Sequence, residues 1–130
     1  EGISSDLEQQ EREEVLSRFR SKNTRVLVAT DVISRGIDIK DINIVVNYDV
    51  PQDAEDYVHR VGRTARAKTT GVAISLINEG DMQKFKRIEE LIDREVIKIP
   101  TPPEIGESPL WNPQKGGNFK KKKFKRKGKR

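Results

Sequence analysis

The sequence predicts an α/β domain, in which a parallel sheet is flanked by helices, followed by a basic tail. Short and nearly continuous apolar runs are typical of strands that are buried on both faces of a parallel sheet. Longer segments between them carry apolar residues at helical spacing. The resulting order of helix, strand, strand, helix, strand and helix is that of a layered α/β domain.

The first predicted helix covers residues 6–20, and two strands follow it at residues 25–29 and 42–47. Ser5 and Glu8 fit a capping box, in which each side chain binds an unpaired backbone donor of the first turn. The apolar residues that share one face of this helix, at helical spacing, are Leu7, Val15, Leu16 and Phe19.

The second half of the domain begins with a predicted helix at residues 53–66, entered after Pro51. A strand at 71–77 and a strongly periodic helix at 80–93 follow, and residues 96–99 are expected to form a short edge strand. We therefore expect a partial domain over residues 1–99.

The charge changes sharply near the C-terminus. The chain has a net charge of +5, but its last twenty residues hold ten Lys and Arg and no acid. Five prolines between residues 100 and 114 favour an extended linker. Residues 115–130 have too few apolar residues to offset their ordering entropy, so we expect a disordered basic tail.

Several classes of function are excluded by composition. The chain has no cysteine, which excludes disulfide scaffolds, cysteine-type zinc sites and thiol catalysis. With a single histidine, we assign no metal ligands. No apolar run is long enough to span a bilayer, and no signal peptide is recognisable, so we expect a cytoplasmic protein. The first residue is Glu1 rather than Met, so we expect a fragment.

The first candidate site directly follows the predicted strand at residues 25–29. Ligands of open α/β sheets bind at the carboxyl ends of strands. There, the Thr30 hydroxyl could bind a phosphate, Gly36 would permit close approach of the backbone, and Asp38 could accept hydrogen bonds from a ribose. A polar strand-to-turn segment without a ligand explains the pattern equally well.

The second candidate site is a cluster of cationic side chains. His59, Arg63 and Arg66 would share one face of the predicted helix, and their mutual repulsion would require an anion. Guanidinium groups suit phosphate oxygens. A solvated basic helix face is the commoner explanation, but Gly62 argues against it, because glycine weakens a helix and indicates close approach of another group.

These residues, taken in order, resemble the second RecA-like domain of DEAD-box RNA helicases. The pair Gln9-x-x-Arg12 is uninformative alone. The resemblance covers residues 2–94, and His59 favours the DEAD-box branch. Residues 98–107 and the basic tail are most like bacterial RhlE-type members. The matching motifs are Gln9-x-x-Arg12, Ala29–Thr30–Asp31…Arg35–Gly36-x-Asp38 and His59–Arg60-x-Gly62–Arg63-x-x-Arg66.

The resemblance implies a largely sequence-independent site for single-stranded or duplex RNA. In that family pattern, Gln9, Arg12, Thr30 and the backbone around Gly36 would hold the sugar–phosphate backbone. Contacts to the backbone position RNA without reading its bases.

The resemblance also implies an ATP site shared with a first RecA-like domain. Asp38 and Gly36 would bind the nucleotide, and Arg63 and Arg66 would be catalytic arginine fingers on the γ-phosphate. Mg²⁺ would be held mainly by the first domain.

The residues at the interface with that first domain would be Arg35 and His59, and His59 would also take part in catalysis. The sequence contains no P-loop and no Asp–Glu–Ala–Asp motif, and the opening strand of the second domain is missing. We therefore expect the C-terminal part of an ATP-dependent helicase that couples ATP binding and hydrolysis to RNA binding and local duplex unwinding. The chain alone is expected to be inactive.

Two alternatives remain open. One is a non-catalytic RNA-binding module whose tail binds phosphates and stacks Phe119 and Phe124 on bases, with ribosomal RNA or ribonucleoprotein as partner. A charged tail that only keeps the protein soluble, or that binds nothing in particular, would show the same composition. The other is a DNA-directed superfamily 2 translocase, against which His59 and the Gln9–Arg12 pair argue.

Overall fold

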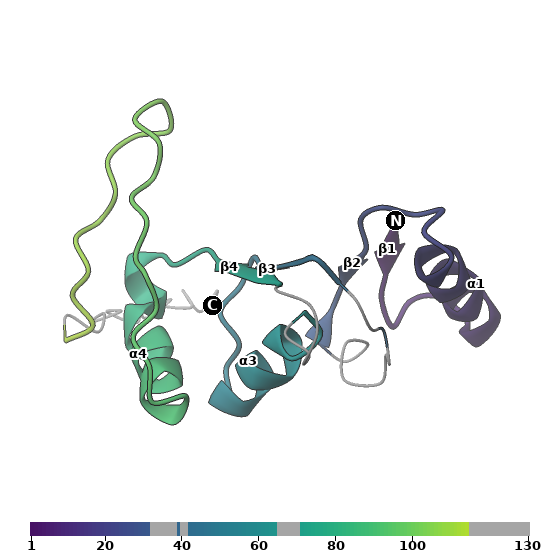
Figure 1. Cartoon of the computed structure of the whole chain (residues 1–130), viewed down its shortest axis with the longest axis horizontal. Helices are drawn as coiled ribbons and strands as arrows, with labels where there is room; N and C mark the ends of the chain where they lie inside the picture. The colour runs from purple at the N-terminus through teal and green to yellow at the C-terminus, as the bar shows by residue number, and fades with distance from the viewer. Residues whose placement is uncertain (32–38, 40–41, 65–70, 115–130) are drawn as a thin grey trace, which may run out of the picture. The chain divides into compact units, whose positions relative to one another are not determined.

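The computed structural model describes residues 1–31, 39, 42–64 and 71–114 (Figure 1). The chain divides into two compact units, and the second begins at Ile77. No helix in these ranges is long and apolar enough to cross a membrane. The elements in chain order are β1 (Gly2–Ile3), α1 (Gln9–Arg20), β2 (Val28–Ala29), β3 (Ile44–Asn47), α3 (Ala54–Val61), β4 (Val72–Ser75) and α4 (Met82–Leu91).

The first unit is an α/β structure with parallel strands, which confirms the predicted fold class. Strand β1 pairs with β2, with Gly2 beside Val28 and Ile3 beside Ala29. Strand β3 pairs with β4, beginning with Ile44 beside Val72. The described strands thus form two separate two-stranded sheets, because β2 and β3 are not paired with each other.

Helix α1 packs on the first sheet with the face that its sequence predicts. Its predicted face lies against a small core formed by Ile3, Val15 and Ile39, each at most 7% exposed. The partly buried residues around this core are Leu7, Leu16, Phe19, Leu27 and Ile42.

The predicted start of α1 was wrong by three residues. The Ser4 hydroxyl accepts the Asp6 N–H and holds residues 4–7 in a turn, so the helix begins only at Gln9. The Glu8 N–H donates to the Glu11 carboxylate over 2.9 Å, so Glu8, and not Ser5, is the residue that precedes the helix.

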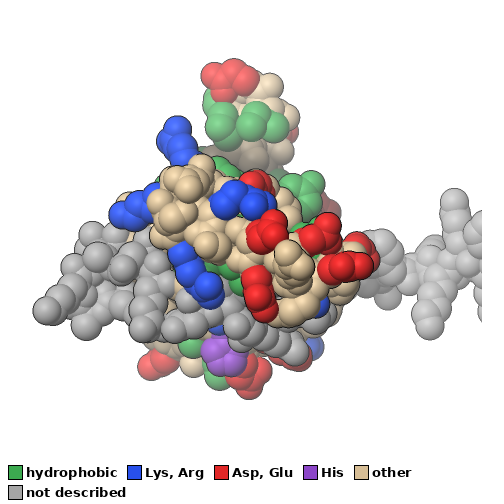
Figure 2. Space-filling view, turned by 90° about the vertical axis from the view of Figure 1, so that its right-hand side faces the viewer, with side chains coloured by type: hydrophobic (Ala, Val, Ile, Leu, Met, Phe, Trp, Pro, Cys, Tyr) green, Lys and Arg blue, Asp and Glu red, His purple; other side chains and the backbone are tan. Residues whose placement is uncertain are grey.

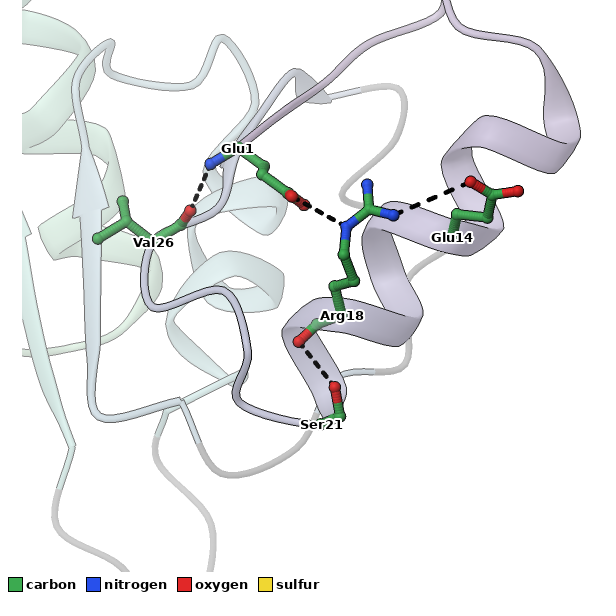
Figure 3. A network of polar contacts seen from close by, with 5 residues as sticks. All are labelled: Glu1, Glu14, Arg18, Ser21 and Val26. Carbon is green, nitrogen blue, oxygen red and sulfur yellow. Dashed lines mark hydrogen bonds and ion pairs between the residues drawn. The ribbon is translucent and has the colours of Figure 1, made fainter.

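Arg18 ties the last turns of α1 to the start of the chain (Figure 3). Its Nε donates to the Glu1 carboxylate over 2.9 Å, and this hydrogen bond lowers the pKa of Glu1. The Glu1 amine donates to the Val26 carbonyl, just before β2. Acidic residues in the first turn of α1 and basic residues in its last turn complement the helix dipole, and Figure 2 shows acidic and basic groups apart on this side.

One face of the β3–β4 sheet is apolar and open to solvent. The pairing places Ile44 beside Val72 and Val46 beside Ile74, and these side chains are 47–58% exposed. The expectation that the strands at residues 25–29 and 42–47 are buried on both faces was therefore wrong, since Val28, Ile44 and Val46 are 56–68% exposed in the described structure. The opposite face carries Asn47, which is buried.

The second unit is built on α4, which a single 3₁₀ turn, Glu79–Asp81, precedes. Met82, Phe85 and Ile88 are buried, as the periodicity predicts, but Leu91 on the same predicted face is 48% exposed. The helix ends earlier than predicted, because Asp93 adopts the left-handed conformation with φ of 49°. The predicted edge strand at 96–99 was wrong: the Val96 N–H donates to the Glu89 carboxylate instead of to a strand.

Candidate functional site

Arg60 of α3 connects the carboxyl ends of two strands that belong to different sheets. Its Nη1 donates to the Asn47 Oδ1 over 3.2 Å and to the Asp49 carbonyl over 2.9 Å, at the end of β3. Its Nη2 forms an ion pair with Asp31, just after β2. The Arg60 side chain is only 16% exposed, whereas the Asp31 side chain that it pairs with is 50% exposed.

Asn47 extends this connection to β4. Its side chain is 2% exposed, and its Nδ2 donates to the Ser75 Oγ over 3.1 Å. Sequence reasoning gave no role to Arg60 or Asn47. The signal that could have found Asn47 is a polar residue that ends the apolar run at residues 42–47, at the carboxyl end of a strand.

The predicted helical alignment of His59 with Arg63 was wrong, and Arg66 lies outside the described residues. Helix α3 ends at Val61, so Arg63 lies beyond it, whereas His59 is exposed in its last turn. The Gly62 N–H donates to the Val58 carbonyl over 2.8 Å, and a Cβ at Gly62 would lie 3.0 Å from that oxygen. The close approach that Gly62 indicated is therefore the approach of its own helix.

Thr64 fixes the segment that follows Arg63. The Thr64 side chain is 2% exposed, and its hydroxyl lies within hydrogen-bonding distance of the carbonyl oxygens of Ile42 and Asn43. Gly71 packs directly against it: a Cβ at Gly71 would lie 1.7 Å from the Thr64 Oγ1. Thr64 and Gly71, the residues on either side of positions 65–70, are therefore in direct contact. The sequence did not predict these contacts, because the Thr64 hydroxyl binds carbonyl oxygens that lie 21 and 22 positions earlier in the chain.

Gln9, Arg12 and Thr30 lie near the ends of neighbouring parallel strands. Gln9 begins α1, which follows β1, and its Nε2 donates to the Glu13 carboxylate over 2.7 Å. Arg12 is half-buried, and its Nε is covered without a hydrogen-bond partner in the described part of the chain. Thr30 is exposed directly after β2. Since β1 and β2 are parallel, their carboxyl ends share one edge of the sheet.

Four of the predicted site residues lie outside the described residues: Arg35, Gly36, Asp38 and Arg66. Within the described ranges, no three His, Asp or Glu side chains come together as a metal site would need. The described part of the site therefore lies at the carboxyl ends of the strands. It carries the guanidinium of Arg60, the exposed imidazole of His59 and the exposed side chains of Thr30 and Gln9.

Comparison with known families identifies the kind of domain that carries this site. Residues 1–68 match the family model of the helicase conserved C-terminal domain. The chain belongs to this family. The solved structures that it resembles are DEAD-box proteins, so this is a helicase C-terminal domain of the DEAD-box type.

Two curated relatives show how much of a helicase the chain represents. It is 45% identical over 102 residues to the ATP-dependent rRNA helicase RRP3 of Scheffersomyces stipitis, covering 78% of this chain and 21% of the relative. It is 52% identical over 96 residues to the ATP-dependent RNA helicase dbp8 of Emericella nidulans, covering 74% and 18%. The chain thus spans about a fifth of the length of these relatives.

Two solved structures agree with the helicase domain. A DEAD-box protein from Methanococcus jannaschii is 48% identical, with a TM-score of 0.65 over 72% of this chain and 26% of that one. Dbp5 of S. cerevisiae, bound to RNA and ADP BeF3, is 38% identical, with a TM-score of 0.63 over 68% and 25%. The RhlE-type subgroup stays a prediction.

Proposed function

We propose that this helicase domain is the C-terminal part of an ATP-dependent RNA helicase, which couples ATP binding and hydrolysis to RNA binding and local duplex unwinding. The observation that carries this proposal is the Arg60 network, which joins Asp31 to Asn47 and Asp49 and so connects two helicase motifs. Similarity to helicases named for RNA and ATP supports it. The location is proposed to be the cytoplasm.

In the proposed RNA site, the amino-terminal turn of α1 and the end of β2 bind the phosphate backbone. Gln9 and Thr30 are exposed and carry neutral donors. Arg12 supplies the positive charge, and its covered Nε has no hydrogen-bond partner among the described residues. A buried donor without a partner is unfavourable, so a phosphate that draws the guanidinium into a hydrogen bond would remove that cost. We assign the backbone around Gly36 to the same site by resemblance.

In the proposed nucleotide site, the chain contributes positive charge beside the transferred phosphate. Arg63 follows the end of α3, and Thr64 fixes the backbone next to it. This restraint limits the positions that the guanidinium can reach, and preorganised charge is what stabilises a phosphoryl-transfer transition state. By resemblance, Arg66 is the second finger and Asp38 and Gly36 bind the nucleotide.

His59 is exposed one residue before Arg60, so it can contact another domain while Arg60 holds its helix in place. We propose His59 and Arg35 as contacts to the first RecA-like domain of the same protein, which would also hold most of the Mg²⁺. ATP supplies the phosphate that is transferred to water.

RNA-stimulated ATPase activity of the full-length protein tests this function. Arg63→Ala is expected to lower turnover by roughly 10³-fold or more, as loss of an arginine finger does. Arg20→Ala, at the exposed end of α1, serves as the matched control and should retain turnover. Equal turnover of both variants, or turnover by the 130-residue chain alone, would contradict the assignment.

A non-catalytic RNA-binding module is the second candidate. The observation that favours it is the ten Lys and Arg without an acid in the last twenty residues, which suit ribosomal RNA or ribonucleoprotein as partner. Under this alternative, the full-length protein binds RNA with steep salt dependence, and Arg63→Ala leaves every measured activity unchanged.

A further inference from the structure

Tyr48, directly after β3, carries an aromatic ring that the described residues leave in solvent. It is 78% exposed, whereas Tyr57, the other tyrosine of the chain, is only 7% exposed. Ligands of open α/β sheets bind at the carboxyl ends of strands, and Tyr48 lies at such an end. The ring is therefore a candidate ligand contact, to which the sequence motifs assign no role.

Buried neighbours direct the Tyr48 ring outward. Successive side chains of a strand point to opposite faces. Val46 is 58% exposed, Asn47 is 2% exposed and Tyr48 is 78% exposed, so the ring continues the open face of the sheet. Val50, which is 4% exposed, returns the chain to the interior two residues later. The burial of Asn47 and Val50 thus sets the direction of the ring.

Arg60 fixes the backbone on both sides of Tyr48. Its Nη1 donates to the Asn47 Oδ1 over 3.2 Å and to the Asp49 carbonyl over 2.9 Å. From the residue after β4, the Leu76 N–H donates to the Asn47 carbonyl over 3.0 Å. A tyrosine on a fixed backbone has only two side-chain torsions to immobilise, so ligand binding costs it little conformational entropy.

The same guanidinium connects Tyr48 to the proposed RNA contact at Thr30. Thr30 is exposed and precedes Asp31, which forms an ion pair with Arg60, while Tyr48 precedes Asp49, whose carbonyl Arg60 also binds. These contacts limit the separation of the Thr30 and Tyr48 Cα atoms to roughly 20 Å. Since a stacked strand rises about 3.4 Å per nucleotide, one strand of about ten nucleotides can reach both residues.

The charges around Tyr48 decide which part of RNA suits the ring. Asp49 is exposed beside it, and residues 41–59 contain five Asp and Glu and no Lys or Arg. A phosphate at the ring would face these carboxylates without a counter-charge from this segment, which is unfavourable. The group that suits the ring is uncharged and flat, and in RNA that group is an unpaired base.

We propose that Tyr48 binds RNA by stacking on an unpaired base of the strand whose backbone contacts Thr30. This inference rests on the proposed RNA-binding function. Stacking uses the flat face that every base has, so the contact keeps binding largely independent of sequence. It requires a base that is free of a partner, and so it favours single-stranded RNA at this position.

Photocrosslinking to the full-length protein tests the contact directly. An oligouridylate of about ten nucleotides, with 4-thiouridine in place of single uridines, is irradiated with the protein, and the crosslinked peptides are identified by mass spectrometry. We expect an adduct on Tyr48 in the wild type. Adducts that never include Tyr48, at any position of the 4-thiouridine, would overturn the proposal.

RNA affinity then tests whether the contact is stacking. Tyr48→Leu, which removes the ring and keeps an apolar side chain, should weaken oligouridylate binding roughly fivefold or more. Tyr48→Phe should retain the affinity, and Val46→Ala, on the same exposed face, is the matched control. An abasic strand of the same length should bind the wild type and Tyr48→Leu equally. An equal loss on the abasic strand would mean that the ring only supports the fold, and would overturn the proposal.

The outcomes also separate this proposal from the function on which it rests. Failure of the wild-type protein to bind oligouridylate would contradict the proposed function. Binding that is unchanged in Tyr48→Leu would contradict only the stacking contact. Lower ATPase turnover or a higher KM for ATP, with unchanged RNA affinity, would assign the ring to a protein or nucleotide contact, and would also overturn the proposal.

Discussion

The guanidinium of Arg60 lies between the carboxylate of Asp31 and the side-chain oxygen of Asn47, and so joins residues that follow β2 to the last residue of β3. The two strands belong to separate sheets, and Arg60 connects them through side chains instead of through a backbone ladder.

Replacement of Arg60 should therefore destabilise the first unit. Arg60→Ala leaves the buried Asn47 amide without one partner, and we expect a loss of about 1–3 kcal/mol in the free energy of unfolding. Arg60→Lys should restore only part of it, because a lysine ammonium cannot reproduce the planar fork of donors. Urea unfolding measures both, and Arg20→Ala is the exposed control. A loss in Arg20→Ala as large as in Arg60→Ala would refute the network's contribution.

The contact between Thr64 and Gly71 gives a second prediction. Gly71→Ala should destabilise the chain by about 1–3 kcal/mol, because the new Cβ would overlap the Thr64 side chain. Thr64→Ala should not rescue it, since the Thr64 carbonyl oxygen would also lie 2.5 Å from that Cβ. Thermal unfolding of the two single variants and the double variant measures this. Rescue in the double variant would contradict the close backbone approach.

Acid should weaken the contacts of Lys98 and Trp111 with α4, in which Lys98 pairs with Glu89 and Trp111 packs on Phe85. Burial would raise the pKa of Glu89, but hydrogen bonds from Lys98 and a backbone N–H outweigh it. Since the pKa of Glu89 is lowered in the folded chain, its contribution to stability is complete above its ordinary value of 4.5 and is lost as the pH falls through the lower folded value. The cations that face it are Lys98 and Lys86. Trp111 fluorescence during an acid titration follows the loss of these contacts. Glu89→Gln should show exposed emission at neutral pH and no such transition, and an unchanged transition would assign it to another group.

The exposed face of β3–β4 should cause self-association. Val46→Thr and Ile74→Thr keep the branched shape that suits a strand but make this face polar. We expect less association in analytical ultracentrifugation and little loss of stability. Val45→Thr, on the opposite face and partly buried, is the matched control and should not reduce association. Equal association in all variants would mean that this face takes no part.

The sequence predicts those features of the domain that depend on local pattern. The apolar face of α1 and the parallel pairing of the strands follow from periodicity and composition, and the motif order indicates the helicase family. The end of α3 at Val61 was missed, because Gly62, which ends the helix, was interpreted as a sign of close approach by another group. The contacts of Arg60 and Thr64 could not be predicted either, since each joins residues more than ten positions apart, and only the folded backbone brings them together.

The loop after α4 is held at its base, because Lys98 pairs with Glu89 and Trp111 packs on Phe85, and this makes the loop tip a place for insertion. Its ends are fixed by Lys98 and Trp111, while Gly106 at the tip has a φ of 118° and open space where a side chain would lie. Exposed loop tips accept inserted segments well. A small reporter domain placed between Glu104 and Gly106 should leave α4 unchanged, so the protein could be labelled without blocking either terminus.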